Sequence, residues 1–186
     1  MLEAFLVSVG LVTLGEIGDK TQLLSLVLAA RFRKPWPIVA GILAATLLNH
    51  TAAGALGAWI TSLVGEAMMT KIVGASFLGM ALWALIPDKL DDVSTERARG
   101  GIFVTTATLF FIAEMGDKTQ VATVMLAARY ESLVAVVAGT TLGMLLADVP
   151  VVFFGDAIAK KVPLRIVRRV TAAAFAALGV LALLAA

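Results

Sequence analysis

Two short segments of the chain carry the same charged and polar residues, 98 positions apart. The first motif is Glu16-Ile17-Gly18-Asp19-Lys20-Thr21-Gln22, and the second motif is Glu114-Met115-Gly116-Asp117-Lys118-Thr119-Gln120. Each motif offers two carboxylates, a hydroxyl and an amide oxygen, and oxygen ligands of this kind are those that hard cations such as Ca²⁺ and Mn²⁺ prefer. We therefore interpret both motifs as candidate cation-binding segments.

The rest of the composition narrows the kind of metal site. The chain has no cysteine and a single histidine, His50, which excludes thiolate sites and the usual histidine-rich clusters. We therefore expect any metal ion to be held by oxygen, and oxygen chemistry by itself does not separate Mn²⁺ from Ca²⁺.

The predicted ligands follow from helical spacing. Two carboxylates three residues apart share one helix face, with the glutamine on nearly the same stripe. The predicted metal ligands are Glu16, Asp19, Glu114 and Asp117. The predicted auxiliary or polar lining residues are Thr21, Gln22, Thr119 and Gln120.

The lysines of the motifs allow two interpretations. Six charged residues inside membrane spans would cost roughly 15–20 kcal/mol before pairing, at about 2.5–3.5 kcal/mol each. In the structural interpretation, Lys20 pairs with Glu16, and Lys118 with Glu114, in the favourable i,i+4 order. That pairing leaves two aspartates unmatched, and one divalent cation or two protons would neutralise them. In the other interpretation, the lysines act as a gate that holds the empty site closed.

The remaining composition is that of a membrane protein. Hydrophobic residues make up 60% and charged residues 15% of the 186 positions, well beyond the hydrophobic share of soluble domains. Apolar runs of membrane-spanning length predict six segments, near residues 3–30, 37–64, 67–87, 101–128, 133–157 and 164–185. Almost nothing is left for a soluble domain.

The repeated motifs belong to a longer internal repeat. Residues 16–31 and 114–129 are identical at ten of sixteen positions, and Gly41 matches Gly139 at the same offset. We therefore divide the chain into a first three-helix repeat (1–87), a charged cytoplasmic linker (88–100) and a second three-helix repeat (101–186). Three spans are an odd number, so the second repeat would enter the membrane in the opposite sense, as in many secondary transporters.

The predicted fold is an all-α integral membrane protein with six transmembrane helices arranged as two inverted repeats. We expect the first and fourth helices to be kinked or broken at the motifs, with Gly18 and Gly116 as hinges. Eleven lysines and arginines fall in the first, third and fifth loops and two in the others. The positive-inside rule then places the central loop in the cytoplasm and both termini outside.

Protons and a metal ion would compete for the same buried carboxylates, which is the basis of an antiport mechanism. Two further polar residues lie within predicted spans at equivalent positions, His50 in the second and Asp148 in the fifth. Such residues are functional candidates. We weigh a role as proton relay or gate equally with simple interhelical hydrogen bonding.

The doubled Glu-x-Gly-Asp-Lys-Thr motif resembles the Gdt-type cation/proton antiporter family, once called uncharacterised protein family 0016, over essentially the whole chain. The resemblance implies a Ca²⁺/Mn²⁺ transporter that exchanges against protons, and for a compact bacterial member a manganese exporter in the inner (plasma) membrane. It also implies that Glu16, Asp19, Glu114 and Asp117 are the cation ligands, and that Mn²⁺ or Ca²⁺ is transported substrate while no prosthetic group is needed.

Other functions remain open from the sequence. One is an exporter of a small organic cation or amino acid, and another is a passive divalent cation channel. We do not expect an enzyme, because the chain has no His-Glu-x-x-His motif, no Ser/His dyad and no cysteine nucleophile. The expected partners are a divalent cation, protons and the lipid bilayer, with no nucleic acid, and the chain could be a monomer or a homodimer.

Overall fold

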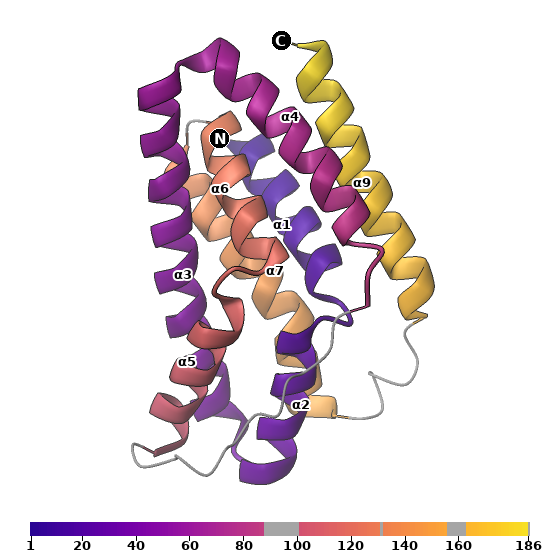
Figure 1. The fold of residues 1–186 in the computed structure, drawn as a ribbon. Helices are drawn as coiled ribbons and strands as arrows, with labels where there is room; N and C mark the ends of the chain where they lie inside the picture. The colour runs from indigo at the N-terminus through magenta and orange to yellow at the C-terminus, as the bar shows by residue number, and fades with distance from the viewer. Residues whose placement is uncertain (88–100, 131, 156–162, 186) are drawn as a thin grey trace.

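The computed structural model describes residues 1–87, 101–130, 132–155 and 163–185, and within these ranges every regular element is an α-helix. The helices are α1 (Leu2–Glu16), α2 (Lys20–Phe32), α3 (Pro35–Val64), α4 (Glu66–Trp83), α5 (Gly101–Glu114), α6 (Lys118–Tyr130), α7 (Leu133–Phe154) and α9 (Leu164–Leu184) (Figure 1). The prediction of an all-α protein is confirmed. The predicted linker at 88–100 and the last residues of the predicted fifth span lie outside the described residues.

The helix boundaries repeat with the same offset as the sequence. Helices α6, α7 and α9 begin at Lys118, Leu133 and Leu164, each 98 residues after the first residue of α2, α3 and α4 respectively. The ends of α1 and α5, at Glu16 and Glu114, differ by the same number. The duplication therefore includes the positions at which the helices begin and end, as well as the sequence motifs.

Burial is distributed as expected for a protein surrounded by lipid. Three helices, α3, α7 and α9, are long and apolar enough to cross a membrane, and α4 and α5 contain shorter apolar stretches. Large apolar side chains lie on the outside, for example Leu48 (61% exposed), Trp59 (59%) and Leu82 (71%), while charged side chains such as Glu16 and Glu114 are fully buried. Soluble proteins rarely expose continuous apolar surface in this way.

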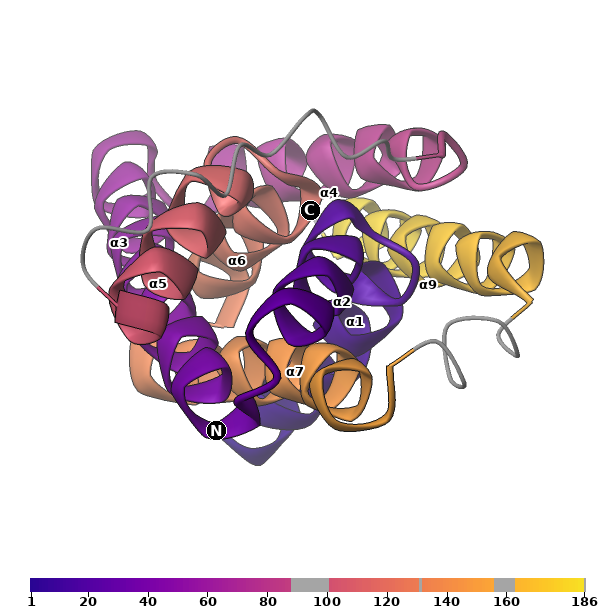
Figure 2. The ribbon, with the colours of Figure 1, turned by 90° about the horizontal axis from the view of Figure 1, so that it is seen from below.

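The helices form a bundle in which α1 lies against α7, α3 against α5 and α6, and α4 against α9 (Figure 2). Two glycines at equivalent positions permit close contacts between helices. A Cβ atom on Gly139 would lie 2.6 Å from the carbonyl oxygen of Phe5 in α1, and one on Gly41 would lie 2.9 Å from that of Phe103 in α5. Small residues at such crossings let backbones approach closely.

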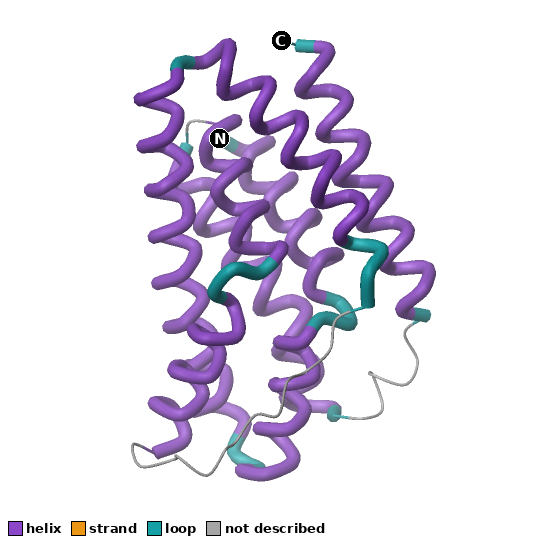
Figure 3. Tube along the Cα trace, in the orientation of Figure 1, coloured by secondary structure: helices purple, strands orange, loops and turns teal. Residues whose placement is uncertain are grey.

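The chain follows opposite directions in its two halves. From the end of the molecule where α1 begins and α9 ends, α1 and then α2 run toward the far end, whereas α5 and then α6 run back (Figure 1). The breaks between α1 and α2, and between α5 and α6, both lie near the middle of the long axis (Figure 3). The two motifs thus meet at one level inside the bundle.

Candidate metal site

Each motif interrupts the helix that contains it. Helix α1 ends at Glu16 and α2 begins at Lys20, while α5 ends at Glu114 and α6 begins at Lys118. Between them, Gly18 has a φ of 83° and Gly116 a φ of 76°, a left-handed conformation that glycine adopts without the steric penalty of a Cβ atom. The predicted break of the first and fourth spans at their motifs is confirmed.

The turn between the helices is built in the same way in both motifs. The amide N–H of each aspartate donates to the carbonyl oxygen of the preceding glutamate, at 3.0 Å for Asp19 and 3.1 Å for Asp117. The side-chain oxygens of the motif glutamines accept from the N–H of the turn glycines, at 2.9 Å for Gln22 and 2.7 Å for Gln120. In this structure the two glutamines therefore stabilise the turns.

The motif threonines orient the glutamates. The hydroxyl of Thr21 donates to Oε2 of Glu16, and the hydroxyl of Thr119 donates to Oε2 of Glu114 at 3.1 Å. The sequence prediction that Glu16 and Asp19 share a helix face is wrong, because the helix ends between them. The tight turn brings their carboxylates together instead.

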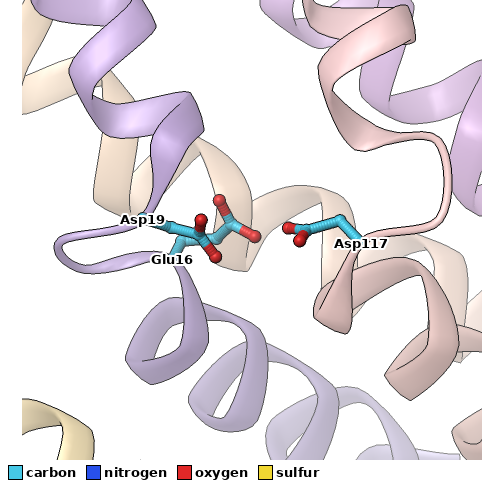
Figure 4. A group of neighbouring side chains, drawn as sticks. All are labelled: Glu16, Asp19 and Asp117. Carbon is cyan, nitrogen blue, oxygen red and sulfur yellow. The ribbon is translucent and has the colours of Figure 1, made fainter. Parts of the chain in front are cut away.

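Three carboxylates from the two motifs converge. Glu16, Asp19 and Asp117 each offer an oxygen within 4.8 Å of the other two, and their side chains point toward one another from opposite sides (Figure 4). All three are buried, with exposures of 0%, 1% and 2%. Glu114 is also fully buried but is not part of this group of three. We call Glu16, Asp19 and Asp117 the carboxylate triad; it offers oxygen ligands of the kind that bind a hard cation.

The lysines pair across the two motifs. Nζ of Lys20 lies 3.2 Å from Oδ1 of Asp117, and Nζ of Lys118 lies 3.4 Å from Oδ2 of Asp19. These ion pairs join the two motifs, whereas the structural alternative predicted i,i+4 pairs with Glu16 and Glu114 within each motif. The physical reason is the break at the glycines, which removes the continuous helix that the i,i+4 spacing requires.

Two further buried polar groups lie beside the motifs, one from each half. Nε2 of His50 in α3 lies 3.7 Å from Oε2 of Glu114, and both residues are fully buried. Asp148 in α7, at the equivalent position, accepts a hydrogen bond from Ser25 at 2.9 Å and is close enough to Glu16 for their charges to interact.

The sequence did not indicate that Ser25 donates a hydrogen bond to Asp148. The sequence also did not indicate the hydrogen bonds that Asn49 forms. Its amide nitrogen donates to the carbonyl oxygen of Phe111 at 3.1 Å, and its oxygen accepts from Gln120 at 3.3 Å. For Asn49, the one available signal was that it directly precedes His50 in the sequence.

A pocket reaches the site from the side of α9. Its lining includes Asp19, Lys118, Ala84, Arg168 and Thr171. It lies where α4 ends and α9 begins, and these ends stand near the level of the helix breaks (Figure 1). The pocket therefore borders the Lys118–Asp19 ion pair on the side of the bundle where α4 ends and α9 begins.

Comparison with known protein sequences identifies relatives of this chain. The family described as divalent cation/proton antiporter GDT1 matches residues 4–92 and 102–186. A Vibrio cholerae protein named "Putative manganese exporter" is 50% identical over 94% of this chain and 88% of its own length. A GDT1-like protein of Synechocystis is 31% identical over 87% of each chain, and GDT1-like protein 5 of Arabidopsis thaliana is 26% identical over 90% of this chain and 89% of its own.

No solved structure matches the chain. The family match covers nearly all of both halves and places the protein among transporters, not enzymes. The chain belongs to the GDT1 family of divalent cation/proton antiporters.

Proposed function

We propose that this protein exports a divalent cation, with Mn²⁺ as the main substrate and Ca²⁺ as a second, in exchange for protons. The observation that carries the proposal is the carboxylate triad, in which oxygens from both motifs lie within 4.8 Å of one another. Three oxygens that lie within 4.8 Å of one another are no more than about 2.8 Å from a common point, slightly beyond the 2.3–2.6 Å of Ca²⁺–oxygen bonds. A small inward movement of the side chains would therefore let a single cation contact all three. The preference for Mn²⁺ is supported by similarity to the Vibrio protein.

The charges of the site account for exchange. The two motifs contribute four carboxylates and two lysines, so the site carries a net charge of about −2 when all of them are ionised. One divalent cation or two protons would neutralise it. Since both use the same oxygens, binding of protons from one side would displace the metal toward that side.

The two halves would provide alternating access. We propose that α1 with α2, α3 and α4 form one three-span repeat, and α5 with α6, α7 and α9 form an inverted copy, with the linker at 88–100 between them. The opposite directions of the two halves support this arrangement (Figure 1). Gly18 and Gly116 would act as hinges, because both sit in turns at the broken helices.

The orientation follows from the positive charges. We propose a bacterial inner membrane location, with the α2–α3 turn and the central linker in the cytoplasm and both termini outside. The basic residues Arg31, Arg33 and Lys34 gather at that turn. The pocket beside Asp19, where α4 ends and α9 begins, would then form part of the route by which the metal reaches the site.

Within the site, each lysine would take the place of the cation when no metal is bound. The ammonium groups of Lys20 and Lys118 hold the aspartates of the opposite motif, so they would keep the empty site neutral enough to remain buried and would move aside for the metal. Asp148 would serve as a proton relay next to Glu16. An unchanged pH dependence of transport in Asp148→Asn would exclude that role.

The decisive experiment is metal flux into proteoliposomes, with Mn²⁺, Ca²⁺, Mg²⁺ and Zn²⁺ compared in the presence and absence of an acidic interior. We expect Mn²⁺ uptake to be driven by the outward proton gradient. Asp19→Asn should lower uptake by more than about tenfold, because even indirect changes at metal sites lower affinity by about 10–100-fold. Asparagine still caps a helix, so α2 should remain intact.

The matched control is Glu3→Gln, which alters an exposed carboxylate at the start of α1 and should leave uptake unchanged. Metal flux that ignores the proton gradient would contradict antiport and favour a passive divalent channel. Proton-coupled transport of an organic cation, without metal flux, would favour the organic exporter instead.

A further inference from the structure

The two halves differ in one buried residue beside the site. His50 and Asp148 occupy equivalent positions, 98 residues apart, and both are 0% exposed. A position that is a carboxylate in one half and an imidazole in the other gives the two sides of the site different ligand chemistry. The hydrogen-bond partners and neighbouring charges of His50 and Asp148 indicate the role of each residue.

Asp148 is held by a hydroxyl group, whereas His50 is not. Ser25 donates to Asp148 at 2.9 Å, but Thr123, which stands at the equivalent position in the second half, donates to the backbone carbonyl of Thr119 at 2.8 Å. Across the described residues, neither ring nitrogen of His50 has a hydrogen-bond partner. A buried polar group without a partner is costly, so this imidazole requires a further explanation.

A carboxylate oxygen lies close to the ring. Nε2 of His50 lies 3.7 Å from Oε2 of Glu114, too far for a hydrogen bond but within reach of a shared metal ion. Two ligand atoms that each lie about 2.1 Å from one ion can be up to about 4.2 Å apart. The geometry therefore fits a metal bridging the imidazole and the carboxylate, and the charge of Glu114 also acts on Glu16 of the carboxylate triad.

We propose that His50 is a nitrogen ligand which, together with Glu114, binds the transported metal and makes the site prefer a transition metal such as Mn²⁺ over Ca²⁺. The proposal rests on the proposed function and deepens it. Imidazole binds transition metals, whereas Ca²⁺ takes oxygen ligands almost throughout. The sequence-based expectation of a site made of oxygen alone is thereby revised, and a relay role for His50 loses support because it has no hydrogen-bonded neighbour among the described residues.

The test uses the fact that His50 is the only histidine in the chain. Purified, tag-free protein is loaded with Mn²⁺, and electron spin-echo modulation is recorded to detect nitrogen bound to the metal. We expect ¹⁴N modulation in the wild type and its replacement by the ¹⁵N pattern after labelling with ¹⁵N-histidine. This measurement needs no variant, so it does not depend on whether a substituted protein folds.

The affinity measurement is made on His50→Gln. We expect its Mn²⁺ affinity to fall by about 10–100-fold, while its Ca²⁺ affinity changes by much less. The matched control is Thr51→Ala, the exposed neighbour of His50 on the same helix, which should keep both the modulation and the affinity ratio.

Two results would overturn the proposal. One is bound Mn²⁺ without histidine nitrogen modulation, and the other is an equal loss of Mn²⁺ and Ca²⁺ affinity in His50→Gln. Either result leaves the proposed function intact if proton-coupled Mn²⁺ flux persists. Absence of both Mn²⁺ binding and Mn²⁺ flux in the wild type would instead reject the proposed function itself.

Discussion

The cross-motif ion pairs predict that replacing Lys118 destabilises the protein far more in the absence of metal than in its presence. The Lys118 side chain is 6% exposed and that of its partner Asp19 is 0% exposed, whereas the side chain of Lys20 is 25% exposed. Removing one partner of a buried pair leaves an uncompensated charge, which costs about 3–5 kcal/mol. Exposed pairs contribute about 0–1 kcal/mol, so Lys20→Met should cost less than Lys118→Met.

A bound cation should reverse much of this loss. In Lys118→Met the motifs retain four carboxylates and one lysine, and a divalent cation supplies the missing positive charge directly beside Asp19. At a free metal concentration about 100 times Kd, binding to the folded state adds about 2.7 kcal/mol. The wild type should gain less at the same concentration, because the ammonium group of Lys118 must leave Asp19 before the metal binds. The apo variant should therefore be much less stable than the wild type, while the metal-loaded variant should approach it.

The assay is thermal unfolding in detergent, with chelator and with increasing Mn²⁺. For a chain of this size, 1 kcal/mol corresponds to a Tm shift of about 2–4 °C, so apo Lys118→Met should unfold about 6–20 °C below the wild type. Lys71→Met, which alters an exposed lysine of α4, is the control and should show no shift. A Lys118→Met Tm equal to that of the control, or a deficit that Mn²⁺ does not reduce, would refute the reasoning.

The glycines give two further predictions, both measured as changes in the free energy of unfolding. Alanine at Gly116 should cost about 1–2 kcal/mol because of its left-handed φ of 76°, and alanine at Gly18 should cost more, because its Cβ atom would also meet a side chain of α9. Equal effects would argue against that contact. Gly139→Ala should cost about 1–3 kcal/mol by pressing on the carbonyl of Phe5. Gly10→Ala, with open space around the added atom, should be neutral or stabilising. A loss of stability in Gly10→Ala as large as that in Gly139→Ala would contradict close packing as the cause.

The sequence by itself determined the helical class, the apolar surroundings and the duplicated motifs. Composition reports how much apolar surface the chain must bury or expose to lipid, and that quantity does not depend on the fold. It also determined where the helices break, because a glycine among charged residues inside an apolar run has a local effect on the backbone. The spacing of Gly139 and Gly143 indicates a helix face of small residues on which another helix can pack closely, but it does not identify α1 as that helix.

The tertiary structure alone decided which charges meet. The i,i+4 rule measures distance along one unbroken helix, so it paired Lys20 with Glu16, whereas packing of the two motifs placed its ammonium group 3.2 Å from Asp117. The separation of Glu114 from the carboxylate triad, and its position 3.7 Å from His50, likewise depend on how α3 and α5 lie against each other. Contacts between residues far apart in the chain are set by the packing of whole helices. The spacing of residues along the sequence does not show which helices pack together or at what distance.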